Sequence, residues 1–240
     1  MKLRIRFSKR GKVRWTSHRD VARMWERALR RARLPVAYTA GFSPRPQLSF
    51  GLALPTGCES DAEYLDVALT APVEAAGLAG ALDPLLPEGV EVMAADTVAP
   101  GVPSLQEAVT SCSWTIEVPG TAAGDLAAAA GRVLGAEALP VERQRKGRDV
   151  VDDLRPSVLA LSCAPGSTTT TTGTDPAGAV LHAELGTRPR GVRPSELARV
   201  MGLTFGTARR TCQWIERDGS RWEPLEADRV AVAPVTERVS

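Results

Sequence analysis

Five arginines follow one another at spacings of three and four residues, the spacing that puts side chains on one side of an α-helix. This set, called the arginine ridge below, consists of Arg19, Arg23, Arg27, Arg30 and Arg31. Guanidinium groups at these spacings repel one another unless anions or water screen them, and they bind phosphates and carboxylates through paired hydrogen bonds. The ridge therefore predicts either a site for a polyanion or a solvated basic face that serves solubility.

A sixth arginine stands in a stiff loop after the ridge. The segment 38–57 reads YTAGFSPRPQLSFGLALPTG and holds Arg45 between Pro44 and Pro46. Each proline fixes its own φ and restricts the residue before it, so Arg45 has little conformational entropy left to lose on binding. The loop therefore predicts one of two roles for Arg45. Its guanidinium either binds a phosphate or carboxylate, or points into water from a rigid turn.

The same loop does not complete a known catalytic motif. The run from Gly41 resembles the nucleophile elbow G-x-S-x-G, but Arg45 replaces the second glycine and the prolines forbid the sharp strand-to-helix turn. The chain also lacks a Gly-Lys-Ser/Thr phosphate loop and a GxGxxG dinucleotide motif. The sequence therefore predicts neither a serine hydrolase nor a nucleotide-binding loop of these types.

Two further side chains near the ridge are candidates for ligand contact. His18 stands at the start of the predicted helix, where an imidazole can act as an acid–base group or hold a phosphate, and where it can equally cap or pack. Phe42 and Trp15 remain as exposed rings on which RNA bases could stack, because Trp25 falls on the apolar stripe of the helix. We expect His18 and Phe42 to line a nucleic-acid site together with the ridge and Arg45.

The distribution of charge favours a polyanionic partner. Residues 1–50 contain 14 Lys and Arg against 2 Asp and Glu, a net charge of +12. The remaining 190 residues contain 16 against 26, a net charge of −10, and the two sum to +2. A region this positive attracts polyanions and releases their counterions. RNA is the predicted partner, since aromatic residues are interleaved with the basic ones.

The cysteines and histidines argue against a resident metal or cofactor. Cys58, Cys112, Cys163 and Cys212 are roughly fifty residues apart, and His18 and His182 are the only histidines. Zinc sites and iron–sulfur clusters need closely spaced ligands, so no metal and no cofactor are expected. Scattered thiols, no secretion-signal pattern and no apolar run of about 18 residues predict a cytoplasmic protein without a membrane segment.

Alternating strands and helices must position these residues. Alternation of apolar and basic residues predicts a strand at 3–7, and Ser17 with Asp20 predicts the capped start of the amphipathic helix that carries the ridge. Short extended pieces are expected at 36–39 and 48–50, strands at 63–69 and 90–98, and a helix at 73–86. The resulting order, strand–helix–strand–strand–helix–strand, is that of the ferredoxin-like fold.

A similar, less regular order follows in the second half. It comprises expected strands at 114–118, 158–163, 179–185 and 207–215, a hairpin at 141–151, and helices at 125–134 and 194–201. We therefore predict an α+β protein of two ferredoxin-like (split βαβ) halves, with antiparallel sheets and helices on one face. The predicted domains are 1–98 and 111–225, with a linker at 99–110 and a tail at 226–240. The low-complexity run STTTTTGTDPAG at 167–178 is expected to form a mobile loop.

About fifty residues of the first half resemble the radical-SAM-linked protein family. The matching stations are Ser17-His18-x-Asp20, Ala28-Leu29-Arg30-Arg31, Gly41-Phe42-Ser43-Pro44-x-Pro46, Leu48-Ser49-Phe50, Leu54-Pro55-x-Gly57 and Glu59-Ser60-x-x-Glu63-Tyr64-x-Asp66. The family has no assigned reaction. The resemblance implies association with a separately encoded radical SAM enzyme and a place in RNA metabolism. This chain has no CxxxCxxC, so it would not hold that enzyme's cluster itself.

The leading hypothesis is a non-catalytic accessory protein that binds tRNA or rRNA and works with a radical SAM enzyme in RNA modification or processing. Its expected binding residues are the arginine ridge, His18, Phe42 and Arg45. One alternative is a protein-interaction module whose ridge docks an acidic surface of the radical SAM partner. The other is a metal-independent endoribonuclease that uses His18, which rests on fold-level analogy alone.

Overall fold

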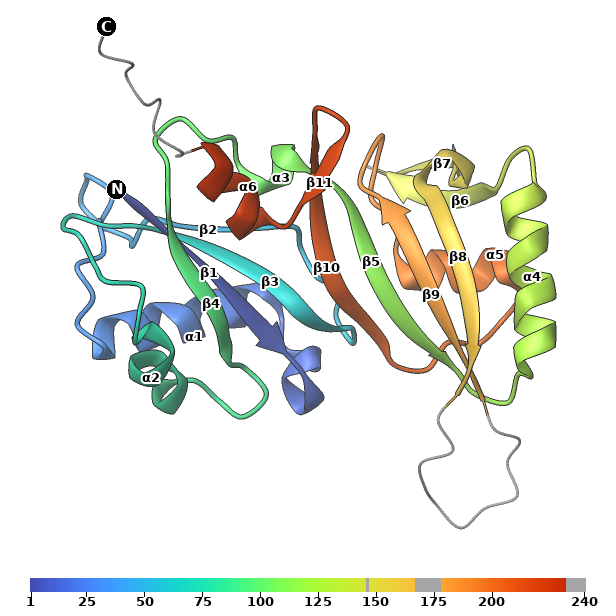
Figure 1. The fold of residues 1–240 in the computed structure, drawn as a ribbon, viewed down its shortest axis with the longest axis horizontal. Coiled ribbons are helices and arrows are strands. Elements are labelled where there is room, and N and C mark those ends of the chain that lie inside the picture. Colours follow the sequence, from blue (N-terminus) through green and yellow to red (C-terminus); the bar gives the residue numbers. More distant parts are fainter. Residues whose placement is uncertain (146, 167–177, 232–240) are drawn as a thin grey trace, which may run out of the picture. The chain divides into compact units, whose positions relative to one another are not determined.

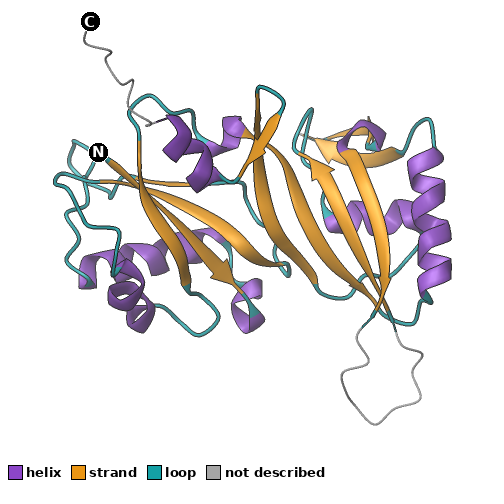
Figure 2. Ribbon diagram, in the orientation of Figure 1, coloured by secondary structure: helices purple, strands orange, loops and turns teal. Residues whose placement is uncertain are grey.

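The computed structural model describes residues 1–145, 147–166 and 178–231, and these residues form a mixed α+β structure with antiparallel strand pairs (Figures 1 and 2). Contacts divide the chain into two compact units. Unit 1 comprises Met1–Val109 with Trp214–Ser240, and unit 2 comprises Thr110–Gln213. The expected mobile loop at 167–178 lies, apart from its last residue, outside the described residues, as does the predicted tail from residue 232 onward.

Unit 1 is built around four strands, β1 (Lys2–Lys9), β2 (Leu48–Phe50), β3 (Glu59–Ala68) and β4 (Val92–Val98). Strand β1 pairs antiparallel with β3 and β4, and β2 pairs antiparallel with β3, which gives the order β4-β1-β3-β2. The strand predicted at 3–7 is confirmed, and Leu3, Ile5 and Phe7 are buried on one face. The burial does not alternate as the sequence suggested, because Arg4 on the other face is buried as well.

Helix α1 (His18–Arg31) begins as the sequence predicts. The Ser17 hydroxyl accepts a hydrogen bond from the Asp20 backbone N–H and donates one to the Asp20 carboxylate. The helix buries Trp25 and Leu29 in the core of unit 1. There the Trp25 ring packs edge to face on Phe7, with ring centroids 4.9 Å apart. Burial of this stripe leaves the arginine ridge on the opposite side of α1.

The helix predicted at 73–86 is shorter than expected. It consists of α2 (Leu78–Leu82) and a 3₁₀ turn, η2 (Asp83–Leu85). At the carboxyl end the reason is Pro84, which has no N–H to donate and so breaks the α-helical hydrogen-bond ladder. At the amino end Gly77 has a left-handed φ of +88°, so the helix begins only after it. The Asp83 carboxylate then accepts from the Val92 backbone N–H, which ties the turn to the start of β4.

Two helices of unit 1 lie where the sequence predicted a linker and a tail. These are α3 (Leu105–Ala108) and α6 (Pro224–Ala231). Arg4 alternates with Leu3 and Ile5 along β1 and therefore faces away from α1, and its guanidinium donates to the Pro224 carbonyl oxygen at the start of α6. Unit 1 thus has helical cover on both faces, whereas the prediction placed the helices on one.

Unit 2 repeats the alternation of strands and helices. Its strands are β5 (Val109–Val118), β8 (Val158–Pro165), β9 (Ala179–Gly186) and residues 208–213 of β10 (Ala208–Arg217), in the order β10-β5-β9-β8. The helices are α4 (Ala123–Gly135) and α5 (Pro194–Met201), and the hairpin is formed by β6 (Pro140–Arg145) and β7 (Arg148–Asp153). A 3₁₀ turn, η3 (Arg155–Ser157), precedes β8. The rest of β10 belongs to unit 1 and pairs with β11 (Ser220–Trp222).

Candidate nucleic-acid interface

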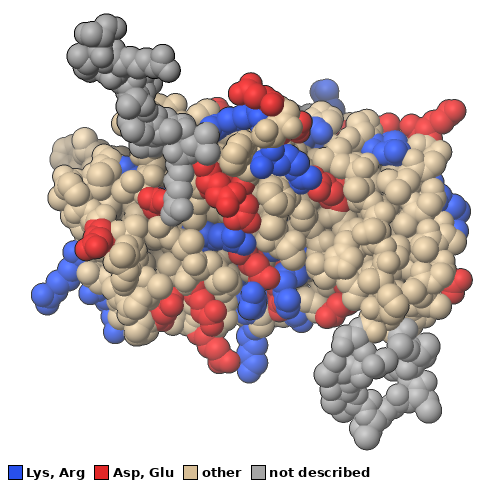
Figure 3. Space-filling model, in the orientation of Figure 1, with Lys and Arg blue, Asp and Glu red and all other residues tan. Residues whose placement is uncertain are grey.

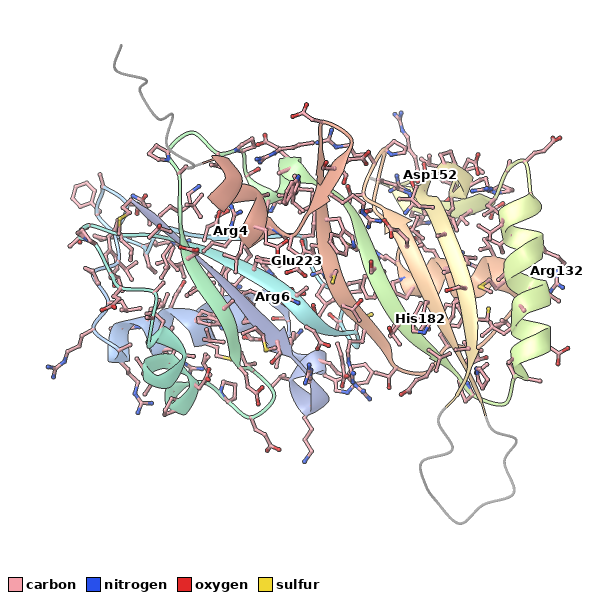
Figure 4. The ribbon with its side chains drawn as sticks, viewed as in Figure 1. Arg4, Arg6, Arg132, Asp152, His182 and Glu223 are labelled. Atoms are coloured by element: carbon pink, nitrogen blue, oxygen red, sulfur yellow. The ribbon has the colours of Figure 1, made fainter. Side chains whose placement is uncertain are left out.

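The basic residues of unit 1 fall into two groups, and the first is neutralised within the unit. Arg4 is completely buried, and its Nε and Nη2 donate to the two carboxylate oxygens of Asp66 at 2.6 and 3.0 Å. Other ion pairs join Lys2 to Asp66, Arg6 to Glu223, Arg10 to Asp61 and Arg14 to Glu59. Figure 4 shows Arg6 and Glu223 on this part of unit 1. These residues contribute little free positive charge to a ligand.

The second group, the arginine ridge, lies open to solvent. All five of its side chains are exposed, and basic groups project from the surface beside α1 in Figure 3. The one ion pair of the ridge within the described residues joins Arg23 to Asp20 at 3.6 Å, with both side chains 58% exposed. A pair this exposed has a small effect on stability. The charge that the sequence assigns to residues 1–50 is therefore available mainly on α1.

The loop after α1 is a closed hairpin. Tyr38 and Pro46 face each other as an isolated antiparallel bridge, and the Thr39 N–H donates to the Arg45 carbonyl oxygen at 2.9 Å. The Arg45 N–H donates in turn to the Thr39 hydroxyl at 3.0 Å. At the base, the Gln47 N–H donates to the Ala37 carbonyl oxygen at 2.8 Å. These bonds fix the backbone of Arg45, whose side chain is exposed.

The hairpin and α1 enclose a groove of about 500 Å³, called the basic groove below. Its lining consists of Arg19, Ala22, Arg23, Glu26, Arg30, Tyr38, Pro44, Arg45 and Pro46. The groove brings Arg45 together with three members of the ridge, although the two segments are separate in the sequence. Guanidinium groups around one concave surface form a site for several phosphates or carboxylates.

The other two ridge arginines lie along a second groove. This groove, called the apolar groove below, has a volume of about 850 Å³ and is lined by Val13, Thr16, Asp20, Val21, Met24, Arg27, Arg30, Arg31, Pro84, Leu85, Leu86 and Pro87. Arg30 lines both grooves. The arginine ridge thus lies between the basic groove and the apolar groove. The helical spacing of the arginines does not reveal that they line two separate grooves.

The structure places His18 and Phe42 outside the basic groove. The His18 ring meets Phe50 edge to face, with centroids 5.0 Å apart, and lines a small hollow with Lys9 and Glu63. Burial lowers the pKa of Lys9, whose ammonium donates to the Thr16 carbonyl oxygen at 3.1 Å. Phe42 is fully exposed on the hairpin.

Sequence reasoning missed two residues of the basic groove, Tyr38 and Glu26. Tyr38 is 51% exposed and supplies the aromatic ring of the groove. Glu26 is the acidic residue of its lining. The signal for Glu26 was its spacing of three and four residues from Arg23 and Arg30, and the signal for Tyr38 was its position at the entrance of the proline-flanked loop.

Trp15, the other ring expected to be exposed, is 64% exposed and packs on a glycine. It ends the 3₁₀ turn η1 (Gly11–Trp15), and the Arg14 guanidinium lies 5.3 Å from its ring centroid. Gly57 has φ +88°, and a Cβ there would be 2.8 Å from the Trp15 ring. Glycine is thus required at position 57 both by its backbone and by the ring.

Two arginines of unit 2, Arg143 and Arg190, take part in an ion-pair network at the β6–β7 hairpin. Asp152 accepts a hydrogen bond from Arg143 and forms an ion pair with Arg190, and Arg190 Nη1 donates to Glu196 at 2.9 Å. The hydrogen bond from Arg143, together with the charge of Arg190, lowers the pKa of Asp152. Figure 4 shows Asp152 in this part of unit 2 and Arg132 on α4. The network neutralises these arginines in the same way as the β1 arginines of unit 1.

Within the described ranges, no three His, Cys, Asp or Glu side chains are grouped so as to hold a metal ion. The helices of the same ranges are all too short or too polar to cross a membrane.

A known family matches most of the chain. The family described as "Uncharacterized protein conserved in bacteria (DUF2344)" matches residues 2–189, a stretch that contains both grooves, the hairpin and most of unit 2. No curated protein matches the chain.

Proposed function

The chain belongs to this DUF2344 family of conserved bacterial proteins, and we propose that it binds single-stranded segments of RNA, such as those of tRNA or rRNA, in the basic groove. The ligand would place its phosphates on Arg19, Arg23 and Arg45. The remaining ridge arginines, Arg27, Arg30 and Arg31, would attract the strand and contact phosphates at its flanks.

The observation that carries this proposal is the convergence of exposed arginines from two separate segments on one concave surface. Arg45 comes from the hairpin and the others come from α1. Within the described residues, the side chains of Arg19, Arg30 and Arg45 have no ion pair or hydrogen bond with the rest of the chain. Bringing like charges together costs free energy unless an anion screens them, so the arrangement favours an anionic ligand.

The shape and chemistry of the groove favour a single strand over other polyanions. Tyr38 provides a partly exposed ring, and bases of unpaired nucleotides stack on such rings. Pro44 and Pro46 add apolar walls. An inorganic polyanion or an acidic peptide would use the arginines but would gain nothing from a stacking surface.

We further propose that both units have the ferredoxin-like fold and that the protein acts in the cytoplasm. The orders β4-β1-β3-β2 and β10-β5-β9-β8 both support two ferredoxin-like units, because a split βαβ unit places its fourth, first, third and second strands side by side. A tRNA or rRNA ligand and cysteines without disulfides fit the cytoplasm.

A radical SAM enzyme is the proposed protein partner, and the resemblance of the loop and helix motifs supports this. The apolar groove is the surface proposed for docking it. Its lining is mostly apolar and contains three arginines against one acidic residue, Asp20, so it complements a partner segment with both apolar and acidic side chains. The endoribonuclease alternative lacks comparable support, since His18 does not line the basic groove.

The salt dependence of RNA binding tests the proposed function. Six arginine–phosphate contacts would give log Kd against log salt a slope of magnitude about 4 for a single strand. The measurement is fluorescence anisotropy of a labelled single-stranded RNA between about 50 and 300 mM KCl. A salt-independent Kd, or no binding at the lowest salt, would refute the proposal.

A further inference from the structure

Glu26 is the unexpected residue of the basic groove. It is half-buried on α1 and lines the groove with four arginines. A carboxylate in this groove weakens the attraction between the arginines and phosphates. Glu26 therefore does not help the groove to attract a polyanion. Its presence therefore requires another explanation.

An internal ion pair does not explain Glu26. Arg23 and Arg30 lie three and four residues away on the same helix, the spacings at which opposite charges pair. Yet across the described chain the Glu26 carboxylate has no ion pair or hydrogen bond. Both of its oxygens therefore remain free to accept hydrogen bonds from a ligand in the groove.

Guanine is the base whose donors fit a carboxylate. Its Watson–Crick edge presents N1–H and the N2 amino group side by side, so that one carboxylate accepts both. The corresponding edges of adenine and cytosine place an acceptor nitrogen next to a single amino group, and uracil places its N–H between two carbonyl oxygens. These acceptors repel a carboxylate, as like charges do. Proteins read unpaired RNA bases on this edge, which is accessible only in single strands.

We infer that the basic groove selects a guanosine nucleotide of the RNA strand. Tyr38 stacks on the base, Glu26 accepts from its N1–H and N2 amino group, and Arg23 and Arg45 hold the adjacent phosphates. This inference rests on the proposed function and adds base selectivity to it.

The test uses labelled oligouridine heptamers that carry one central variable nucleotide. With guanosine at the centre, binding should be about 10-fold tighter than with adenosine, cytidine or uridine, a typical gain for a bidentate base contact. Inosine, which keeps N1–H but lacks the amino group, should fall between. Guanosine monophosphate should compete only at concentrations at least about 100-fold above the Kd of the RNA, because it lacks the flanking phosphates. Competition at the same concentration as the RNA would identify the free nucleotide as the ligand and overturn the inference.

The Glu26→Gln variant gives a signature that a folding defect would not produce. It should lose the preference for guanosine and at the same time bind uniform oligouridine more tightly, because a negative charge has left the groove. Glu74→Gln is the matched control, since Glu74 is an exposed residue of unit 1 outside the groove lining and its replacement makes the same charge change. The control should keep the preference.

The outcomes separate this inference from the proposed function. Equal, arginine-dependent and salt-dependent binding of all four oligonucleotides would overturn guanosine selection and leave RNA binding intact. A guanosine preference that survives Glu26→Gln would also overturn the role of Glu26. Failure to bind any oligonucleotide would overturn both.

Discussion

At the scale of residues, the same amino acid has two opposite roles in unit 1. Arg4 is desolvated and bonded to both carboxylate oxygens of Asp66, so it belongs to the folded core. Arg19 and Arg45 are solvated and carry no partner within the described chain, so their charge acts outward. The partners and burial of each arginine, rather than the number of arginines, decide which of them can bind a ligand.

The Arg4–Asp66 pair predicts a large loss of stability when it is broken. Asp66→Ala removes the carboxylate that accepts two hydrogen bonds from the buried Arg4 guanidinium and should lower the free energy of unfolding by about 3–5 kcal/mol. Glu223→Gln, which removes the charge that pairs with the less deeply buried Arg6, should lower the free energy of unfolding by less than Asp66→Ala does. Urea unfolding followed by circular dichroism measures both.

A double variant shows whether the loss of stability comes from the buried charge of Arg4 or from the lost attraction between Arg4 and Asp66. Arg4→Met combined with Asp66→Leu removes both charges of the pair and should recover most of the stability lost in Asp66→Ala, because the Arg4 charge no longer has to be buried. If Asp66→Ala were as stable as the wild type, the distinction between structural and ligand-binding arginines would lose its basis.

At the scale of elements, α1 separates two surfaces of different chemistry. One side, with the hairpin, forms the basic groove, and the other side, with the turn at η2, forms the apolar groove. Pro84 contributes to this division, because it shortens the predicted helix and leaves Leu85 and Leu86 in the groove lining. Two ligands of different kinds could therefore be held by one helix.

The two grooves predict separable binding defects. In co-purification of the tagged protein from its bacterium after nuclease treatment, a radical SAM protein should be captured by the wild type. Arg27→Glu combined with Arg31→Glu should lose the capture, because both reversed charges lie in the lining of the apolar groove. Arg19→Glu combined with Arg45→Glu should retain it. Capture that depends on intact RNA, or that survives the first pair of changes, would contradict docking in the apolar groove.

At the scale of the whole molecule, the sequence predicts the features that depend on residues close together in the chain. The capped start of α1, its buried stripe and the exposed ridge follow from spacings within the segment 17–31. The net charge of +12 over residues 1–50 is less informative, because long-range pairs such as Arg4–Asp66 and Arg6–Glu223 neutralise part of it. The spacing of Glu26 from Arg23 and Arg30 puts it on their side of α1, but its meeting with Tyr38 in one groove depends on how the hairpin closes against α1, which spacing along the chain does not give.

RNA affinity of a charge-reversed groove tests the central claim most directly. The triple variant Arg19→Glu, Arg23→Glu and Arg45→Glu should weaken the binding of single-stranded RNA at least about 100-fold near 100 mM salt and reduce the salt slope by about 2. Arg132→Glu, a single reversal of an exposed arginine on α4 of unit 2, should change the affinity less than about 2-fold. Equal affinities of the triple variant and the wild type, with both proteins folded, would contradict the account.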